Sequence, residues 1–402
     1  MFQLAREVRR TEPLVPSGSL EATGLMGILD RYVLVLFTKV FVISFVSLTG
    51  MFVVGDFVGN LNEFLDHAPQ QGGLAALMAA YYGARVPWFF DATSRALAMV
   101  AAVFTITWLQ RHNEMTALMA AGIPQGRIVK PLLGAVVLIS LLAAVNRETA
   151  IPALREQLSR DAQDWRSGDL TVLQPRHDHE TDILLGGQAV LAAERRIEKP
   201  SFLLPPELQD YGRQLRAAHA EYQDADGQRP RGFLLREVTE PPELDQLPSI
   251  VVRGRPVVLF RRDTPWLGTG ECFVATNITF EQLIGGTAWR QFASTVELLR
   301  GLHNPSLDYG ADVRVTVHAR VVQPLLDILL LLLGLPVVVA RQSRNVFVTV
   351  GFCMVLLGAF FAVGLACHSL GMNYLISPSL AAWLPLIIFA PCAAVLAAPR
   401  QA

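Results

Sequence analysis

Four ionisable residues interrupt the most apolar stretches of this chain: Lys39, Asp91, Arg95 and Asp327. An ionised side chain in hydrocarbon is costly, so such residues usually pair, reach the membrane surface or line a wet cavity. Lys39 either extends to the surface or meets an anion. Asp91 and Arg95, at positions i and i+4, either neutralise each other on one helix face or contact an acidic head group. Asp327 is either protonated or paired with a neighbouring helix.

A further candidate for chemistry is the polar string RHDHE, which contains His177, Asp178, His179 and Glu180. It could bind a metal, but it lacks a distant third ligand, so we expect a solvated loop and no metal. No GxSxG, HExxH or GxxxxGKS/T motif occurs, so we expect no hydrolase, metalloprotease or P-loop site. The cysteines match no zinc spacing and are expected to be buried packing residues: Cys272, Cys353, Cys367 and Cys392.

The composition predicts membrane-spanning elements around these residues. The chain is 52 % hydrophobic and only 17 % charged, with a mean hydropathy of +0.37, whereas a soluble domain carries about 25 % charged residues. The net charge of −1 provides no basic field for nucleic acid. Apolar residues gather at both ends and leave a polar middle, which excludes an ordinary soluble enzyme. Six stretches are long enough to span a membrane, at about 32–55, 86–109, 127–147, 321–340, 346–368 and 375–398.

The basic residues that flank these spans predict their orientation. The flanking regions that fall on one side are rich in arginine and lysine, whereas the opposite loops 57–85 and 369–374 hold only Arg85. We therefore expect both termini inside the cell and the large polar insert outside. The basic residues on the inner side are Arg6, Arg9, Arg10, Arg31, Arg111, Arg127, Lys130, Arg341, Arg344 and Arg400.

The polar insert, 148–313, contains short β-prone runs that are separated by turn signals such as Gly186-Gly187. This pattern is typical of an all-β sandwich or roll. The stretch Trp289–Leu302 has helical character and leads back to the membrane. The β-prone runs are 182–185, 189–193, 232–235, 250–259 and 272–280.

A short amphipathic helix is predicted in the loop RHNEMTALMAAGIPQGRIVK, between the second and third spans. Met115, Leu118 and Met119 form one apolar stripe. Glu114 lies near the helix start, where a carboxylate complements the helix dipole, and Gly122 is placed to end the helix. The helix either lies on lipid or fits a groove on a cytoplasmic partner.

With these motifs, the chain resembles the LptF/LptG family, the paired permease subunits of the lipopolysaccharide-export ABC transporter. The resemblance covers nearly all of both membrane halves, whereas the middle matches only in size and β character. The matching motifs are Asp30-Arg31-Tyr32 with Lys39, Glu114–Gly122, Arg320-VVQ-Pro324 continuing to Leu333-Gly334-Leu335-Pro336, and Ser377-Pro378-SLAAWLP-Leu386. Asp91 and Arg95 depart from the family, in which this region is normally more apolar.

The resemblance implies a membrane α plus β fold, with six transmembrane helices and a periplasmic β-jellyroll-like domain between the third and fourth. It implies a paralogous or identical permease partner, a cytoplasmic ABC ATPase dimer, periplasmic β-jellyroll bridge proteins and a lipopolysaccharide-like lipid. ATP and magnesium would bind to the ATPase, and this chain would need no cofactor. The implied coupling residues are Glu114, Met115, Leu118, Met119 and Gly122. Arg31 and Lys39 would lie near the acidic head group of the lipid.

Small residues on two spans are candidates for a lateral gate. Ser44, Ser47 and Gly50 form a strip on the first span, which is foremost a packing feature because small residues let another helix approach closely. In the family the first span packs against the partner's fifth span. Gly351 and Gly358 are the matching small positions on span five.

The sequence therefore predicts a non-catalytic permease subunit that extracts a lipid from the inner membrane with the energy of a separate ATPase. Two alternatives remain open: a membrane-anchored periplasmic scaffold or binding protein, and a proton-driven secondary transporter that uses Asp327. The expected domains are a cytoplasmic segment (1–31), spans one to three with a coupling helix at about 112–122 (32–147), the β-jellyroll-like domain (148–313) and spans four to six (314–402).

Overall fold

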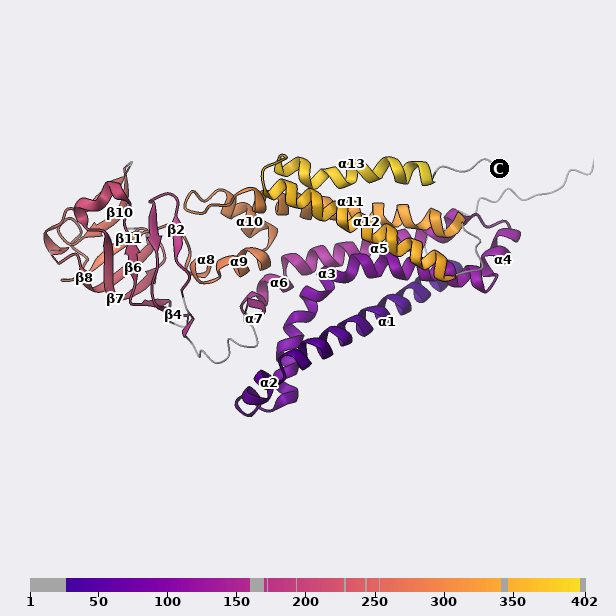
Figure 1. Ribbon diagram of the computed structural model, residues 1–402, viewed down its shortest axis with the longest axis horizontal. Coiled ribbons are helices and arrows are strands. Elements are labelled where there is room, and N and C mark those ends of the chain that lie inside the picture. Colours follow the sequence, from indigo (N-terminus) through magenta and orange to yellow (C-terminus); the bar gives the residue numbers. More distant parts are fainter. Residues whose placement is uncertain are drawn as a thin grey trace, which may run out of the picture.

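The computed structural model describes most of the chain as an elongated molecule with a helical bundle at one end and a β-sheet at the other (Figure 1). The described residues are 27–159, 170–171, 173–192, 194–227, 229–242, 244–252, 254–340 and 346–397. Several basic residues used to predict the orientation, Arg6, Arg9, Arg10, Arg341, Arg344 and Arg400, lie outside these ranges, as does most of the expected segment 1–31.

Six long helices of the described chain are apolar enough to cross a membrane. All but the last extend beyond the apolar runs that predicted them, because hydropathy marks the hydrocarbon-crossing part and not the helix ends. The helices are α1 (Ile28–Gly59), α3 (Leu74–Arg111), α5 (Gln125–Glu148), α11 (Ala311–Ala340), α12 (Val346–Met372) and α13 (Pro378–Ala397).

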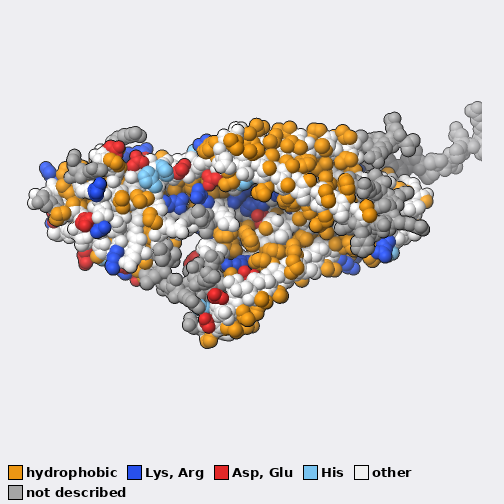
Figure 2. Space-filling model, in the orientation of Figure 1, with side chains coloured by type: hydrophobic (Ala, Val, Ile, Leu, Met, Phe, Trp, Pro, Cys, Tyr) orange, Lys and Arg blue, Asp and Glu red, His pale blue; other side chains and the backbone are white. Residues whose placement is uncertain are grey.

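The outer surface of this bundle is apolar, as expected of helices that face lipid. Large hydrophobic side chains such as Met51, Val355 and Leu365 are exposed, and hydrophobic atoms cover most of the bundle in Figure 2. The bundle also has an interior, in which Ile106 and Leu109 of α3 pack with Ile128 and Leu132 of α5. The cysteines follow this division, because Cys353 and Cys367 are buried whereas Cys392 is exposed. The prediction that all four cysteines are buried is therefore wrong for Cys392.

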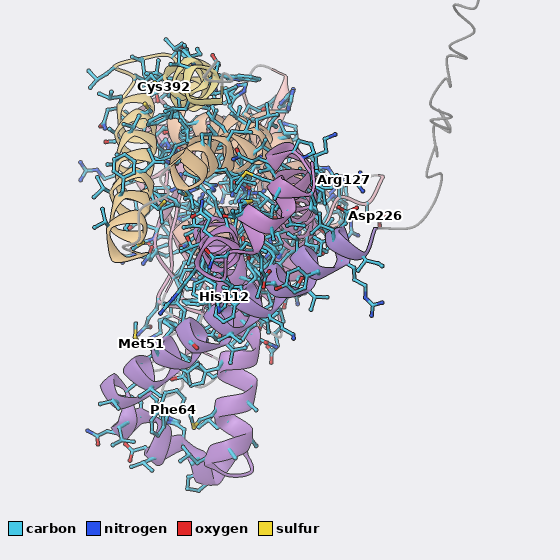
Figure 3. The ribbon with its side chains drawn as sticks, turned by 90° about the vertical axis from the view of Figure 1, so that its right-hand side faces the viewer. Met51, Phe64, His112, Arg127, Asp226 and Cys392 are labelled. Atoms are coloured by element: carbon cyan, nitrogen blue, oxygen red, sulfur yellow. The ribbon has the colours of Figure 1, made fainter. Side chains whose placement is uncertain are left out.

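A small lobe stands away from the bundle where α1 ends (Figure 3). It contains α2 (Leu61–His67), the 3-10 turn η1 (Ala68–Gln71) and the first part of α3. Phe64 is fully buried there against the rings of Tyr81 and Tyr82. The Tyr82 hydroxyl donates to Asp56 Oδ2 at 2.9 Å, which ties the end of α1 to α3.

The sheet lies between α5 and α11 in the chain and curls into an antiparallel half-barrel (Figure 1). Its main path is β1-β4-β5-β7-β8-β11-β10-β9, and β6 joins β7 to the β2–β3 hairpin. The strands are β1 (Leu170–Thr171), β2 (Arg176–Asp178), β3 (Ile183–Leu185), β4 (Ala189–Leu191), β5 (Arg196–Glu198), β6 (Ser201–Leu203), β7 (Gln214–Gln223), β8 (Gly232–Glu240), β9 (Ile250–Val252), β10 (Arg255–Phe260) and β11 (Cys272–Ala275).

The predicted β-prone runs all contain strands, but two of them are interrupted. The run 250–259 is divided into β9 and β10 by a turn at Gly254, which has a φ of +78°. The run 272–280 ends early because Thr279 caps a short helix, accepting from the Gln282 backbone N–H at 3.2 Å. Alternate side chains of β7 and β8 pack into one core with Phe202 and Phe260.

Short helices connect the sheet with the bundle. On the outgoing side, α6 (Ala150–Ala153) and α7 (Arg155–Ser159) follow α5. On the return, α8 (Phe280–Ile284), α9 (Gly286–Phe292) and α10 (Thr295–Leu302) lead into α11, which agrees with the helical character predicted for 289–302. The backbone N–H of His179 donates to the Ser306 carbonyl at 3.1 Å, so the β2–β3 turn contacts the segment before α11.

Candidate functional site

The loop between α3 and α5 forms a compact hairpin around α4 (Glu114–Ala120). Gly122 has a φ of +80°, and its N–H donates to the Met119 carbonyl at 2.9 Å. The N–H of Ile123 donates to the Leu118 carbonyl at 3.0 Å. This pair of bonds is the Schellman motif, which places Gly122 where the left-handed backbone needs a glycine. The helix therefore ends as the sequence predicts.

The apolar stripe of α4 faces the protein's own bundle. Met115 is only 3 % exposed and packs in the same core as Ile106 and Leu109. Leu118 and Met119 are partly buried against that core. The stripe thus anchors α4, and its exposed surface consists instead of small side chains: Thr116, Ala117, Ala120, Ala121 and Gly122.

Two polar contacts tie the start of α1 to this hairpin. The Tyr32 hydroxyl donates to Glu114, with distances of 2.9 Å to Oε2 and 3.1 Å to Oε1. The Arg127 guanidinium, at the start of α5, forms an ion pair with Asp30 at 3.2 Å. Both contacts are exposed, so each contributes little stability by itself. They nevertheless place Glu114 beside the first span.

The candidate head-group residues of the first span lie on one face of α1. Arg31 and Lys39 are both exposed and line a shallow groove of about 510 Å³ with apolar neighbours such as Val35 and Ile43. They do not lie in the same cavity as Asp91 or Arg95.

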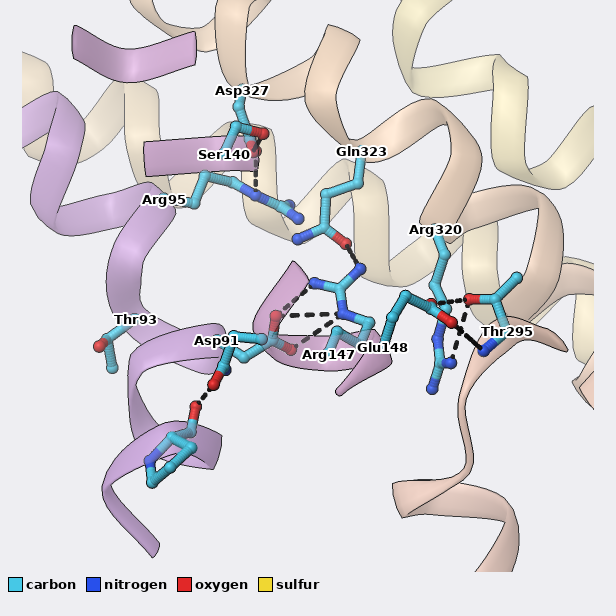
Figure 4. Close-up of polar contacts among 12 residues, drawn as sticks. Asp91, Thr93, Arg95, Ser140, Arg147, Glu148, Thr295, Arg320, Gln323 and Asp327 are labelled. Atoms are coloured by element: carbon cyan, nitrogen blue, oxygen red, sulfur yellow. Dashed lines mark hydrogen bonds and ion pairs between the residues drawn. The ribbon is translucent and has the colours of Figure 1, made fainter. Parts of the chain in front are cut away.

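Asp91 and Arg95 lie in a partly buried polar layer that joins α3, α5 and α11 (Figure 4). Arg147 forms an ion pair with Asp91 at 2.6 Å and donates to Gln323 Oε1 at 2.8 Å. Arg95 forms an ion pair with Asp327 at 2.6 Å. The prediction that Asp91 and Arg95 neutralise each other is therefore wrong, because each forms its ion pair with a residue of another helix. The alternative that Asp327 pairs with a neighbouring helix is the one observed.

The layer continues toward the sheet. Ser140 donates to Asp327 Oδ2 at 2.7 Å. Glu148 accepts from the Thr295 N–H at 2.9 Å, and Arg320 donates to the Ala293 carbonyl at 2.8 Å. A cavity of about 330 Å³ opens between these helices, and basic (blue) and acidic (red) side chains are visible in a hollow of this face in Figure 2.

The small residues predicted for a lateral gate lie on the surface of the bundle. Ser47, Gly50, Gly351 and Gly358 are exposed, and Ser44 is half-buried. A Cβ added at any of the three glycines would meet no atom within 4 Å. The two strips are therefore open to a helix from outside the chain.

The polar string RHDHE forms the edge of the sheet and the turn that follows. Asp178 is fully buried and accepts from the Thr276 hydroxyl at 2.5 Å and from the Glu180 N–H at 2.9 Å. Within the described residues, no group of three or more His, Cys, Asp or Glu side chains could hold a metal ion. Asp178 thus has a structural task, which is to fix the β2–β3 turn.

Comparison with known families gives a match over both membrane halves. The model of the lipopolysaccharide export system permease LptF/LptG matches residues 31–177 and 288–398. The chain belongs to the LptF/LptG family. A search of curated proteins finds no match. The matched ranges include α4 and the polar layer, whereas most of the sheet lies between them.

Three residues of this LptF/LptG family member that the sequence analysis missed are Arg147, Ser140 and Gln323. Arg147 is the ion-pair partner of Asp91, Ser140 donates to Asp327, and Gln323 accepts from Arg147. Each lies near the end or the middle of an apolar run, where a polar side chain needs a partner at the same depth. A search of the sequence for polar residues at matching depths in two different spans could have identified these three residues.

Proposed function

We propose that this chain is a permease subunit of an ABC-type exporter that extracts lipopolysaccharide, or a similar lipid, from the inner membrane. Family membership supports the class of transporter, and six membrane-span-capable helices support a multi-pass inner-membrane protein. The proposal adds a separate cytoplasmic ATPase dimer, a second permease subunit and periplasmic bridge proteins with β-jellyroll folds. ATP and magnesium bind to the ATPase, and this chain performs no chemistry.

The observation that carries the proposal is the position of α4 at the end of the bundle opposite the sheet (Figure 1). A helix anchored through Met115, with Glu114 and small side chains exposed or partly exposed, suits a groove on a cytoplasmic partner. Closure of the ATPase would move α4, and the contacts of Glu114 with Tyr32 and of Arg127 with Asp30 would transmit that movement to α1. The sheet, as a periplasmic jellyroll-like domain, would receive the lipid.

In this proposal, Arg31 and Lys39 on α1 attract the acidic head group of the cargo, and the two strips of small residues pair with the second subunit as lateral gates. The orientation follows from the flanking basic residues, with α4 and both termini in the cytoplasm. Asp327 forms a short ion pair with Arg95. This contact favours a structural role for Asp327 over the role of a proton carrier.

The test is affinity purification of the full chain from native membranes, with mass spectrometry of the retained proteins and lipids. Wild type should retain an ABC ATPase and a lipopolysaccharide-like lipid. Glu114→Lys should lower ATPase recovery at least tenfold, because it places a cation at the α4 start and removes the acceptor of Tyr32. Glu156→Lys, a charge reversal on α7 near the sheet, is the matched control.

Retention of the ATPase by Glu114→Lys at the wild-type level would refute the role of Glu114. Wild-type chain without any ATPase would instead support the scaffold or binding-protein alternative. Transport by the purified chain that requires a proton gradient and no ATP would support the secondary-transporter alternative.

A further inference from the structure

An apolar groove runs between α1 and α5 on the outside of the bundle. It has a volume of about 790 Å³, which lies in the range of about 300–1,000 Å³ that is usual for sites holding one small ligand. The groove adjoins the one that Arg31 and Lys39 line, with which it shares Leu34 and Thr38, and it shares no lining residue with the cavity of the polar layer. It is lined by Leu34, Phe37, Thr38 and Phe41 of α1 and by Pro131, Gly134, Ala135, Leu138, Ile139 and Leu142 of α5, with Asp30, Arg127 and Lys130 at one end.

The groove is long enough to extend across the hydrocarbon of one leaflet of a membrane. Its α5 wall extends from Arg127 to Leu142, which at 1.5 Å per residue is about 22 Å of helix axis. One leaflet contributes about half of a hydrocarbon core of roughly 30 Å. The groove is open along this length, since Leu138 and Leu142 in its wall are 59 % and 51 % exposed. A Cβ on Gly134 would meet no atom within 4 Å, so this glycine widens the groove.

The charged end of the groove is basic. Arg127 and Lys130 outnumber Asp30 there, and Arg127 is 53 % exposed in its ion pair with Asp30. In the part of the chain that the structure describes, no hydrogen bond or ion pair is seen for Lys130. A solvated pair of this kind exchanges partners at little cost. Two cations at the end of an apolar groove complement a lipid, because the cations can bind its phosphate and the groove can hold its acyl chains.

We propose that the α1–α5 groove is a binding site for an anionic glycerophospholipid of the leaflet that borders α4. The acyl chains lie along Phe37, Phe41 and Leu138, and the phosphate contacts Lys130 and Arg127. The volume of the groove falls in the range of sites that hold one small ligand, which favours a lipid with few acyl chains over the many-chained saccharide lipid proposed as the cargo. The site requires only that the chain spans a membrane, and it does not depend on the transport proposal.

The experiment uses the full chain in nanodiscs of phosphatidylcholine that contain one fifth phosphatidylglycerol. The protein is then transferred to a mild detergent, and native mass spectrometry counts the lipids that remain bound. Wild type should retain phosphatidylglycerol in preference to phosphatidylcholine. Lys130→Gln and Arg127→Gln should each reduce this preference about fivefold, since a basic residue at the surface contributes about that factor in lipid binding.

Gly134→Leu should abolish retention of the lipid because its side chain fills the groove. Gly55→Leu is the matched control, since it adds the same side chain at another open helix glycine outside the groove. Arg111→Gln is the matched charge control, because Arg111 is exposed near α4 and does not line the groove.

Equal phosphatidylglycerol retention by Gly134→Leu and Gly55→Leu would overturn the proposal. So would a preference for phosphatidylglycerol that survives removal of both cations. If the chain purified from native membranes holds lipopolysaccharide that Gly134→Leu displaces, the groove is a cargo site and the phospholipid proposal is also overturned.

Discussion

Two ion pairs of the polar layer each join residues of different helices. Asp91 and Arg95 belong to α3, whereas their partners Arg147 and Asp327 belong to α5 and α11. A buried pair adds little net stability over an apolar pair of the same size, but removal of one member leaves an uncompensated charge. The two pairs therefore specify how the three helices meet more than they stabilise the bundle.

Asp327→Asn should lower the free energy of unfolding by about 3–5 kcal/mol, because Arg95 would keep its buried charge without a counter-ion. The double variant Arg95→Gln with Asp327→Asn should recover most of this loss, since two neutral amides can bond to each other. Denaturant-induced unfolding of the detergent-solubilised chain measures both quantities. Additive losses in the double variant would show that the two side chains are not coupled.

At the level of single residues, the sequence identified the unusual charges but not their partners. The i, i+4 spacing of Asp91 and Arg95 predicted a contact within one helix, and the structure pairs both residues across helices. Spacing along a helix reports which side chains share a face, whereas the partner depends on which other helix carries an opposite charge at the same depth. The contact of Glu114 with Tyr32 could not be predicted for the same reason, because it joins residues of two different helices.

At the level of elements, the apolar stripe of α4 packs against the bundle, and the small residues of α4 are exposed on its other side. Its seven residues are too few to be stable as an isolated helix. Its stability must come from the packing of Met115, Leu118 and Met119 on the bundle and from the Schellman motif at Gly122. The sequence predicted both the stripe and the terminal glycine. It could not show whether the stripe faces the bundle or a partner, because both surfaces are apolar.

Met115→Ala should destabilise the docking of α4 by about 2–5 kcal/mol, which is the usual range when a large buried side chain is truncated. Thr116→Ala, on the neighbouring exposed position, should have almost no effect. Hydrogen exchange of the α4 amides measures the difference. If α4 provides the ATPase contact, Met115→Ala should also reduce ATPase recovery although its side chain is buried. Equal exchange rates in the two variants would contradict the anchoring role.

Helices were easier to predict than their lengths. The apolar run 86–109 correctly predicted a helix, but α3 already begins at Leu74. The first turns of α3 lie in the small lobe, where Tyr81 and Tyr82 pack on Phe64. Pro87 lies inside the helix, a position that would end many helices in water but is tolerated in membrane helices. Tertiary packing thus decided the boundary that composition left open.

At the scale of the whole molecule, the arrangement has two chemically different ends. The sheet and its polar surface form one end, and the α4 hairpin with Arg127 forms the other (Figures 1 and 3). The polar layer lies between the helices on the side of the sheet, where α10 contributes Thr295 and α5 contributes Glu148. An energy input at α4 would therefore have to pass along the long helices, and α1 is the helix that contacts the hairpin directly through Tyr32.

This polarity makes the proposed orientation directly testable by cysteine labelling. A variant in which alanine replaces the four native cysteines is the unlabelled background. Replacement of Cys272 is a precaution, because this thiol is buried and burial raises its pKa, so it should react little in the folded chain. Thr116→Cys on α4 and Asp226→Cys on the β7–β8 turn are both at exposed positions, at opposite ends of the molecule. A membrane-impermeant maleimide should label Asp226→Cys in right-side-out vesicles and Thr116→Cys only in inside-out vesicles, because the flanking arginines predict that the α4 side lies in the cytoplasm. Labelling of Thr116→Cys from outside intact cells would remove the possibility that α4 meets a cytoplasmic ATPase, whatever the family of the chain.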